Sequence, residues 1–299
     1  MKKHLLIALL ISLFVRCDGD RVDIGGDESY RREIENWRKE RIERLQSPAG
    51  WLTLAGLFWL AEGANSFGSA GSNDIVFPDP APARVGVFEL ENGTEQVTIA
   101  PDVKVLCEGQ PVSRLLLQSD LNGNPTILTW GALSWYLIDR QGRQAIRLKN
   151  NNSPELKNFT GIAYFPIELN WKVPARLERF DPPRKIRVPN ILGGVSEETC
   201  PGELLFDIGG QAATLTTIED GTESLLVIFA DGTSGRETYG GGRFLRVALP
   251  DTSGMTIVDF NKAYNPPCAF TPYATCSLPP EQNRLAIAVT AGEKSYGNH

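Results

Sequence analysis

The stretch that decides the fold is ELLFDI-GG-QAATLTTIE-DG-TESLLVIFA-DG, residues 203–232. Gly-Gly and Asp-Gly pairs separate three runs of apolar and β-branched residues there. Such pairs accept the positive backbone angles that two-residue hairpin turns require, and the runs between them are typical of strands. We therefore predict a three-stranded antiparallel meander over these residues.

The rest of the chain has the same pattern of short apolar runs between turn residues. This pattern predicts a mainly β fold, an antiparallel β-sandwich or barrel arranged as two β-rich halves. The polar stretch NNNSPELKNF, residues 150–159, is the best boundary between the halves. The further strands that we predict are 84–90, 96–99, 103–106, 113–118, 126–130, 133–139, 145–148 and 285–290.

One amphipathic helix is predicted before the strands begin. Apolar residues recur at helical spacing among charged ones, and Ser47-Pro48 ends the run. We group this helix with the first β-rich half as residues 28–149, and we assign residues 160–299 to the second half, which holds the candidate ligand site. The apolar positions of the helix are Tyr30, Ile34, Trp37, Ile42 and Leu45.

The N-terminus has the pattern of an export signal. Positive residues at 2–4 precede an apolar run over 5–15, which is too short to cross a bilayer as a helix. Cys17 resembles the acylated cysteine of bacterial lipoproteins, although Arg16 stands where their signal peptidase prefers a small residue. We therefore predict a lipoprotein-like signal peptide (1–17), a polar tether (18–27) and a protein of the cell envelope that is anchored to the membrane through Cys17.

Charge and histidine content exclude several function classes. The formal net charge of −6 argues against nucleic-acid binding, because phosphate neutralisation needs a basic surface. The densest basic run, residues 31–44, alternates with glutamates and is interpreted as a solvated helix face. Histidine occurs only at His4 and His299, so histidine-based triads and zinc sites are excluded. We expect neither a metal nor a cofactor.

Four cysteines remain once Cys17 is assigned to the signal: Cys107, Cys200, Cys268 and Cys276. An oxidising compartment permits disulfides, and Cys268 and Cys276 are the candidate pair. Closing that short loop would contribute about 2.5 kcal/mol on the chain-entropy model. Two small buried thiols are the alternative.

The stretch DGTSGRETYGGGRF, residues 231–244, is the first candidate binding cluster. Arg236 and Arg243 bracket Tyr239 and three glycines. Glycines let backbone N–H groups turn toward a ligand, and arginine forks match carboxylate or phosphate oxygens. The cluster is therefore either an anion cradle or a loop whose arginines pair with nearby acids.

The stretch DFNKAYNPPCAF, residues 259–270, is the second cluster. Asp259 and Asn261 share one face at strand spacing, and Tyr264 and Asn265 follow on a chain stiffened by prolines. A polar cluster on rigid backbone suits a preformed site. The same side chains would also satisfy the backbone of a long loop.

We hypothesise that the two clusters lie side by side. The PDTSG turn at 250–254 would make their strands antiparallel neighbours and bring Arg243 near Asp259 and Asn261. The favoured function is binding of a small anionic molecule. One alternative is a histidine-free, metal-independent enzyme with Asp259, Tyr239 or Tyr264 as the acid or base, and the other is a structural or protein-interaction module.

Several motifs resemble a bacterial and archaeal family known as domain-of-unknown-function family 1684. They span residues 47–294, and the family carries no activity that the resemblance would transfer. The motifs are SPAGWLTLAGLFWL, SWYLIDRQGRQAIRL, GRETYGGGRFL, DFNKAYNPPCAFTPYATCSLPPEQNRL and AGEK.

A looser resemblance links residues 62–90 to the opening of a forkhead-associated domain, a β-sandwich that binds phosphothreonine peptides. Gly68-Ser69 and Asn73-Asp74-Ile75 match that family's pattern. Its phosphate-binding arginine is missing between Gly68 and Ser69, and Gly86 stands at its histidine. The resemblance thus implies a shared fold without the phosphopeptide function.

Overall fold

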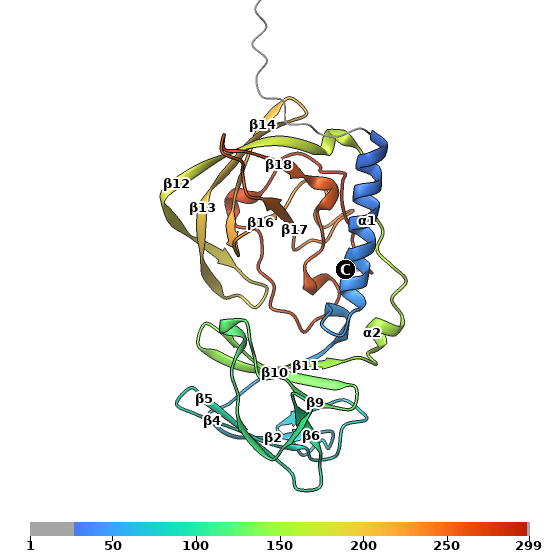
Figure 1. Cartoon of the computed structure of the whole chain (residues 1–299), viewed down its shortest axis with the longest axis vertical. Coiled ribbons are helices and arrows are strands. Elements are labelled where there is room, and N and C mark those ends of the chain that lie inside the picture. Colours follow the sequence, from blue (N-terminus) through green and yellow to red (C-terminus); the bar gives the residue numbers. More distant parts are fainter. Residues whose placement is uncertain (1–26, 298–299) are drawn as a thin grey trace, which may run out of the picture.

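A computed structural model describes residues 27–297, which form two β-rich bodies stacked along the long axis (Figure 1). The mainly β fold class is confirmed. The predicted signal peptide, nearly all of the tether, and the acylation at Cys17 lie outside the described residues. No helix within residues 27–297 has the length and apolar character needed to cross a membrane.

The first half is a sandwich of two sheets. Its core packs the rings of Phe67, Phe77, Phe88 and Trp135 against one another. The six-stranded sheet contains, in spatial order, β1 (Leu54–Trp59), β11 (Arg143–Asn150), β10 (Leu133–Arg140), β9 (Leu128–Trp130), β6 (Val105–Cys107) and β7 (Gln110–Val112). The five-stranded sheet contains β3 (Ile75–Val76), β2 (Gly63–Gly68), β4 (Gly86–Glu91), β5 (Thr94–Ile99) and β8 (Arg114–Leu116).

The second half is built on one long antiparallel hairpin. Its strands curve around a core that includes Leu204, Phe229 and Phe260, with a second, three-stranded sheet on the other side. The four-stranded sheet contains β14 (Gln211–Thr216), β13 (Val195–Ile208), β12 (Lys172–Pro189) and β18 (Met255–Asp259). The three-stranded sheet contains β15 (Ile218–Asp220), β16 (Ser224–Phe229) and β17 (Arg243–Ala248).

Short helical segments connect these sheets. In the predicted boundary region, the Ser153 hydroxyl accepts a hydrogen bond from the Leu156 N–H at the start of α2. The segments are α2 (Pro154–Lys157) and the 3₁₀ turns η1 (Trp51–Thr53), η2 (Asp120–Asn122), η3 (Leu169–Trp171), η4 (Phe260–Lys262), η5 (Pro267–Ala269) and η6 (Glu281–Asn283).

The predicted meander at 203–232 forms, but it is divided between the two sheets. Gly209 and Gly210 both have positive φ and turn β13 into β14, and a second hairpin joins β15 to β16. Between β14 and β15 the chain changes sheets at Thr217. There the Asn283 side chain supplies hydrogen bonds that a neighbouring strand would otherwise make. It accepts from the Thr216 N–H at 2.8 Å and donates to the carbonyls of Thr216 and Ile228.

The predicted last strand at 285–290 is wrong. This segment forms no ladder, although the Leu285 N–H donates to the Ala230 carbonyl at 2.8 Å. The Val289 carbonyl instead accepts a hydrogen bond from the buried Arg243 side chain, and the Val289 N–H donates to Asp231. Its backbone groups therefore bond partly to the backbone of residues 230–232 and partly to this buried side-chain pair, without forming a strand ladder.

The predicted helix is present as α1 (Asp27–Gln46), and it lies along the second half (Figure 1). We had grouped it with the first half because that half follows it in sequence. Its buried residues Tyr30 and Arg41 instead bond with Asp259 and Glu293, near the other end of the chain. Polar partners far along the sequence therefore decide where the helix packs.

Removing the Asn283 side chain should destabilise the junction between the two sheets. Asn283→Ala leaves a buried N–H and two carbonyls without their partner, which we expect to lower the free energy of unfolding by about 3 kcal/mol. Urea denaturation measures the loss. The exposed neighbour Gln282 provides the control, because Gln282→Ala should stay within about 0.5 kcal/mol of the parent protein. Equal effects from the two substitutions would contradict this role of Asn283.

Candidate functional site

Arg243 lies in the core of the second half, with 0% of its side chain exposed. Its Nη2 is 2.9 Å from Asp231 Oδ2, and the guanidinium also donates to the carbonyls of Val289 and Ala291. Arg243 therefore pairs with Asp231, not with Asp259 as the sequence analysis had it. Its bonds join β17 to the C-terminal segment, and this enclosure leaves no open face for a ligand.

Asp259 and Asn261 connect η4 to α1. Asp259 Oδ1 accepts from the Tyr30 hydroxyl at 2.7 Å, and the Asn261 side-chain amide donates to the same hydroxyl at 2.8 Å. All three residues are buried, and burial raises the pKa of both Asp259 and Tyr30. This cluster holds the first turn of the helix against the second half.

Asn265 belongs to a second buried cluster, farther along α1. Arg41 Nε lies 2.9 Å from Glu293 Oε1, and Arg41 Nη2 donates to the Asn265 carbonyl at 2.9 Å. The Asn265 N–H in turn donates to Glu293 Oε2 at 2.7 Å. Glu293 is fully buried, and that burial raises the pKa of its carboxyl while Arg41 opposes the rise.

Arg236 and Tyr239 lie on the loop between β16 and β17 and join neither buried cluster. Arg236 is exposed. Tyr239 is half-buried against Leu45, Leu52 and Phe270, and this burial raises the pKa of its hydroxyl. The residues predicted to form one cradle are therefore distributed over several places.

Tyr264, one of the residues that the sequence analysis proposes for ligand binding, lines a cavity. The two predicted segments do lie side by side here, because the N–H groups of Phe244 and Tyr264 each donate to the other's carbonyl, at 2.8 and 2.9 Å. The cavity next to Tyr264 has a volume of about 390 Å³. Its walls are Trp37, Arg41, Arg44, Arg246, Lys262 and Tyr264, so they contain four cations and no acid.

A groove extends from this cavity toward the first half. A neighbouring hollow of about 390 Å³ shares Arg41, Arg44, Arg246 and Tyr264 with it. That hollow shares Trp51, Leu226, Phe244 and Pro267 with a third one of about 260 Å³, which Arg147 and Thr275 also line. We call these three connected hollows the basic groove.

The cations of the groove differ in how firmly they are held. Arg41 is fixed by Glu293, and its guanidinium lies 4.8 Å from the centre of the Tyr264 ring. Arg44 is 3.5 Å from Glu40, and both side chains are more than half exposed. Arg246 Nε donates to Asp220 at 2.6 Å, a hydrogen bond that raises the pKa of Arg246, whose side chain is also mostly exposed.

The sequence analysis missed Arg41, Arg44 and Arg246. It interpreted the basic run on the helix as a solvated face, because glutamates alternate with the arginines. One signal was present: Arg41 stands between Ile34 and Leu45 on the helical face that the structure buries. An arginine on a buried helix face requires an acidic partner elsewhere in the chain.

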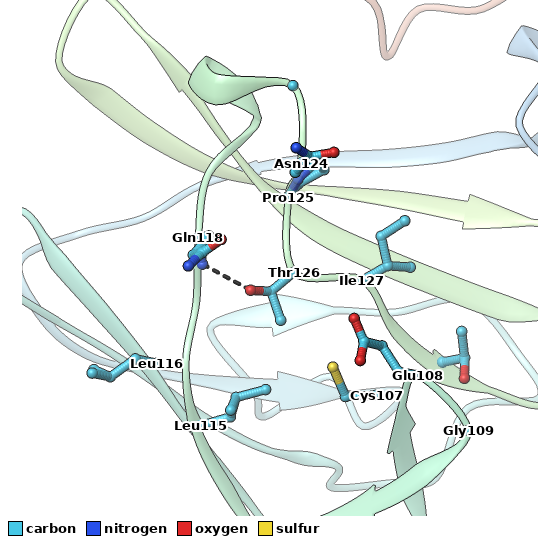
Figure 2. A pocket seen from close by; sticks show the side chains of 12 residues that line it. Cys107, Glu108, Gly109, Leu115, Leu116, Gln118, Asn124, Pro125, Thr126 and Ile127 are labelled. Atoms are coloured by element: carbon cyan, nitrogen blue, oxygen red, sulfur yellow. Dashed lines mark hydrogen bonds between the residues drawn. The ribbon is translucent and has the colours of Figure 1, made fainter.

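A further hollow, of about 820 Å³, lies in the first half (Figure 2). Cys107 and Glu108 line one side of it, and Thr126, whose hydroxyl oxygen accepts a hydrogen bond from the Gln118 N–H at 2.9 Å, lines another. Burial raises the pKa of Cys107, so its thiol is not activated. This hollow therefore offers no reactive group and no cluster of charges.

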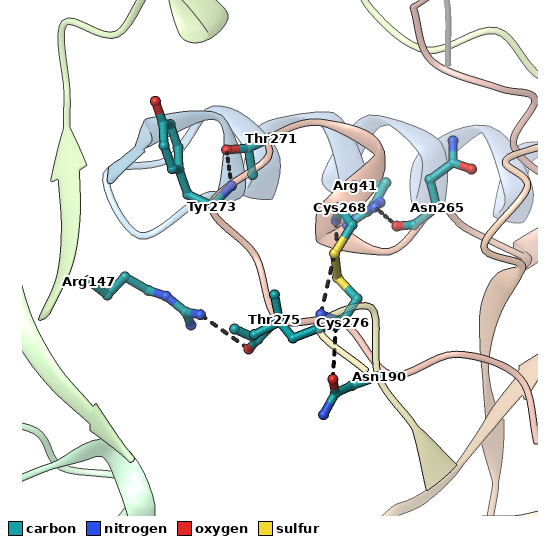
Figure 3. The surroundings of a disulfide bond; sticks show 10 residues. Arg41, Arg147, Asn190, Asn265, Cys268, Thr271, Tyr273, Thr275 and Cys276 are labelled. Atoms are coloured by element: carbon teal, nitrogen blue, oxygen red, sulfur yellow. Dashed lines mark hydrogen bonds between the residues drawn. A yellow bond between two sulfur atoms is a disulfide. The ribbon is translucent and has the colours of Figure 1, made fainter. Parts of the chain in front are cut away.

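Within residues 27–297, no group of three or more histidine, cysteine, aspartate or glutamate side chains is placed so that it could hold a metal ion. The structure joins Cys268 and Cys276 in a disulfide at the groove's inner end (Figure 3). Cys107 and Cys200 are free thiols.

Residues 157–294 match a family described as proteins of unknown function (DUF1684), a narrower range than the motifs suggested. The chain is similar to an uncharacterized protein of Haloarcula marismortui with a solution NMR structure, at 32% identity over 49% of this chain and 83% of that one, with a TM-score of 0.41. An FhaA FHA domain in complex with another protein's intracellular domain matches at 13% identity over 31% of this chain and 97% of that one, with a TM-score of 0.20. No curated protein matches the chain.

Arg41 should be far more important for stability than Arg44, one turn away on the same helix. Arg41→Met leaves Glu293 buried without its cation, and we expect a loss of about 3 kcal/mol in the free energy of unfolding. Arg44→Met breaks only an exposed pair and should cost about 0.5 kcal/mol or less. Chemical denaturation of the two variants gives the comparison. A loss below about 1 kcal/mol for Arg41→Met would show that the pair does not hold the helix.

Glu95 of β5 should make stability fall as the pH rises. It is 1% exposed, neither carboxylate oxygen has a hydrogen bond within the described chain, and burial raises the pKa of Glu95 to about 8. The unfolded chain releases this proton near pH 4.3, so between about pH 5 and 8 the folded state binds the extra proton and loses stability with rising pH. The free energy of unfolding, measured by urea denaturation at several pH values in that range, should depend less on pH in Glu95→Gln than in the parent protein. The same change at Glu91, which is exposed, should leave this pH dependence unaltered, and equal pH dependence for Glu95→Gln and the parent would contradict the assignment.

Proposed function

The chain belongs to the DUF1684 family of proteins of unknown function, and we propose that it binds a small anionic molecule in the basic groove beside α1. The observation that carries this proposal is the composition of the outer cavity. Four cationic side chains and two aromatic rings form its walls, without a carboxylate. Guanidinium groups bind carboxylate and phosphate oxygens in paired hydrogen bonds, and the aromatic faces suit an apolar part of the same molecule.

Arg44 and Arg246 are the side chains that would hold the anion. Their pairs with Glu40 and Asp220 lie at the surface, where an ion pair contributes about 0–1 kcal/mol. An incoming carboxylate or phosphate therefore replaces these partners at small cost. Arg41 is different, because its bond to the buried Glu293 fixes it as a wall of the site.

Tyr264 connects this proposal with the sequence-based hypothesis. It is the predicted ligand-binding residue that lines the cavity, and burial raises the pKa of its hydroxyl, while Arg246 and Arg41 oppose that rise. A protonated tyrosine at this position donates a hydrogen bond to an anion. Asp259, one of the three acid or base candidates of the enzymatic alternative, is instead engaged with Tyr30.

Two further predictions accompany the proposal. Export and anchoring through Cys17 would place the groove outside the cytoplasm, where it would meet envelope or extracellular solutes. The net charge of −6 disfavours nucleic acid as the ligand and so favours a small molecule.

Binding of simple anions tests the proposal. Hexanoate and hexyl phosphate should bind the protein in calorimetry, and hexanol, with the same chain but no charge, should bind at least about tenfold more weakly. Arg246→Met should lower the affinity for both anions by about tenfold, because the charged hydrogen bonds of the guanidinium are lost.

Arg114→Met is the matched control, because Arg114 is an exposed arginine of β8 in the first half. It should leave both affinities unchanged. If neither anion binds, or if Arg246→Met binds them as tightly as the parent protein, the groove is not an anion site.

A further inference from the structure

Arg147 of β11 is a buried cation without an acidic partner among the described residues. It is 4% exposed, and its Nε has no hydrogen-bond partner within residues 27–297. Its Nη2 lies 3.4 Å from the Thr275 hydroxyl, a long and weak contact. The other cations that line the basic groove each have a carboxylate partner, so Arg147 stands apart from all of them.

The position of Arg147 explains why it is buried. Its neighbours Ile146 and Leu148 point into the core of the first sandwich, so Arg147 stands on the opposite face of the sheet. That face is covered by the loop of the Cys268–Cys276 disulfide, and Arg147 reaches across to Thr275 of this loop (Figure 3). The side chain therefore lies between the two halves of the molecule.

A buried guanidinium that contacts hydroxyl groups but no carboxylate is unfavourable. Burial lowers the pKa of Arg147, because the charged form loses water, and the nearby Arg140 acts in the same direction, while Tyr136 and Asp120 oppose the change. Arg140 is itself neutralised by Asp120, at 2.7 Å, so that carboxylate is already engaged. A buried charge of this kind is normally compensated by an anion. The cavity of about 260 Å³ that Arg147 lines has room for one.

Between Arg147 and the outer cations the groove is apolar. Trp51, Leu226, Phe244 and Pro267 line both the hollow that contains Arg44 and Arg246 and the hollow that contains Arg147. The order along the groove is thus outer cations, an apolar middle, and an inner end with the buried Arg147 beside Arg140, which Asp120 already neutralises. A molecule that filled the groove would need a matching order of groups.

We infer that the ligand carries two anionic groups, carboxylates or phosphates, at the ends of an apolar body. Arg147 and Thr275 bind the inner anion, and Arg44 and Arg246 bind the outer one. The apolar body lies over Trp51 and Phe244. This inference rests on the proposed function and adds the class of ligand to it.

A length series on the unmodified protein tests the inference. Linear dicarboxylates from succinate to sebacate are titrated against monocarboxylates of the same carbon number, and alkane bisphosphates against the matching alkyl phosphates. In at least one series, the doubly charged compound of optimal length should bind about tenfold or more tightly than the singly charged compound of the same length, because its second anionic group binds intramolecularly. Arg147→Met should abolish this advantage and leave the affinity of the singly charged compound.

Arg143→Met serves as the control on the same strand, since Arg143 is exposed and lies over the Trp59 ring instead of in the groove. It should keep the full advantage of the doubly charged ligand. If doubly charged compounds bind no more tightly at any length in both series, the inference is overturned, while single anions that still require Arg246 leave the proposed function intact. If the single anions do not bind either, both proposals fail.

Discussion

The ion pair between Arg41 and Glu293 is the contact on which the arrangement of this molecule depends. It joins two residues 252 positions apart, and both are buried. Neither charge is tolerable without the other, so the helix and the C-terminal segment require each other. The pair also positions the site, because Arg44 and Trp37 lie on the same helix and Arg41 covers the Tyr264 ring. Stability and the proposed binding function thus use the same contact.

The buried polar groups of the second half form a sequence of such contacts. Asp231 and Arg243 hold the C-terminal segment, Glu293 and Arg41 hold the C-terminal half of the helix, and Asp259 holds its first turn through Tyr30. Arg243, Asp259 and Asn265, which the sequence analysis assigns to ligand binding, therefore make buried contacts that hold the second half together. The groove instead uses cations at the rim of this interior, where exposed ion pairs can be exchanged.

The sequence predicted local structure better than it predicted partners. The hairpin turns and the helix follow from glycine pairs and helical spacing, which are local properties of the chain. Phe244 and Tyr264 do bring the two predicted segments side by side, but the antiparallel pairing predicted across the turn at 250–254 is wrong, because β17 and β18 belong to different sheets. The partner of Arg243 did not follow from the sequence, since Asp231 and Asp259 are equally plausible carboxylates in sequence. The role of Arg147 was hidden for the same reason, because its burial depends on a loop 128 residues away.

The placement of α1 makes the second half discontinuous in sequence. Its helix is complete by Gln46, but the acid that receives Arg41 comes 252 positions after that arginine, with the whole first sandwich in between. The sandwich is in effect an insertion between a helix and its docking site. During synthesis the helix emerges first and pairs last, after the sandwich has had time to fold as a unit. Closure of this long loop makes completion of the second half a late step, and chains that end before Glu293 would expose a helix whose arginine has no partner.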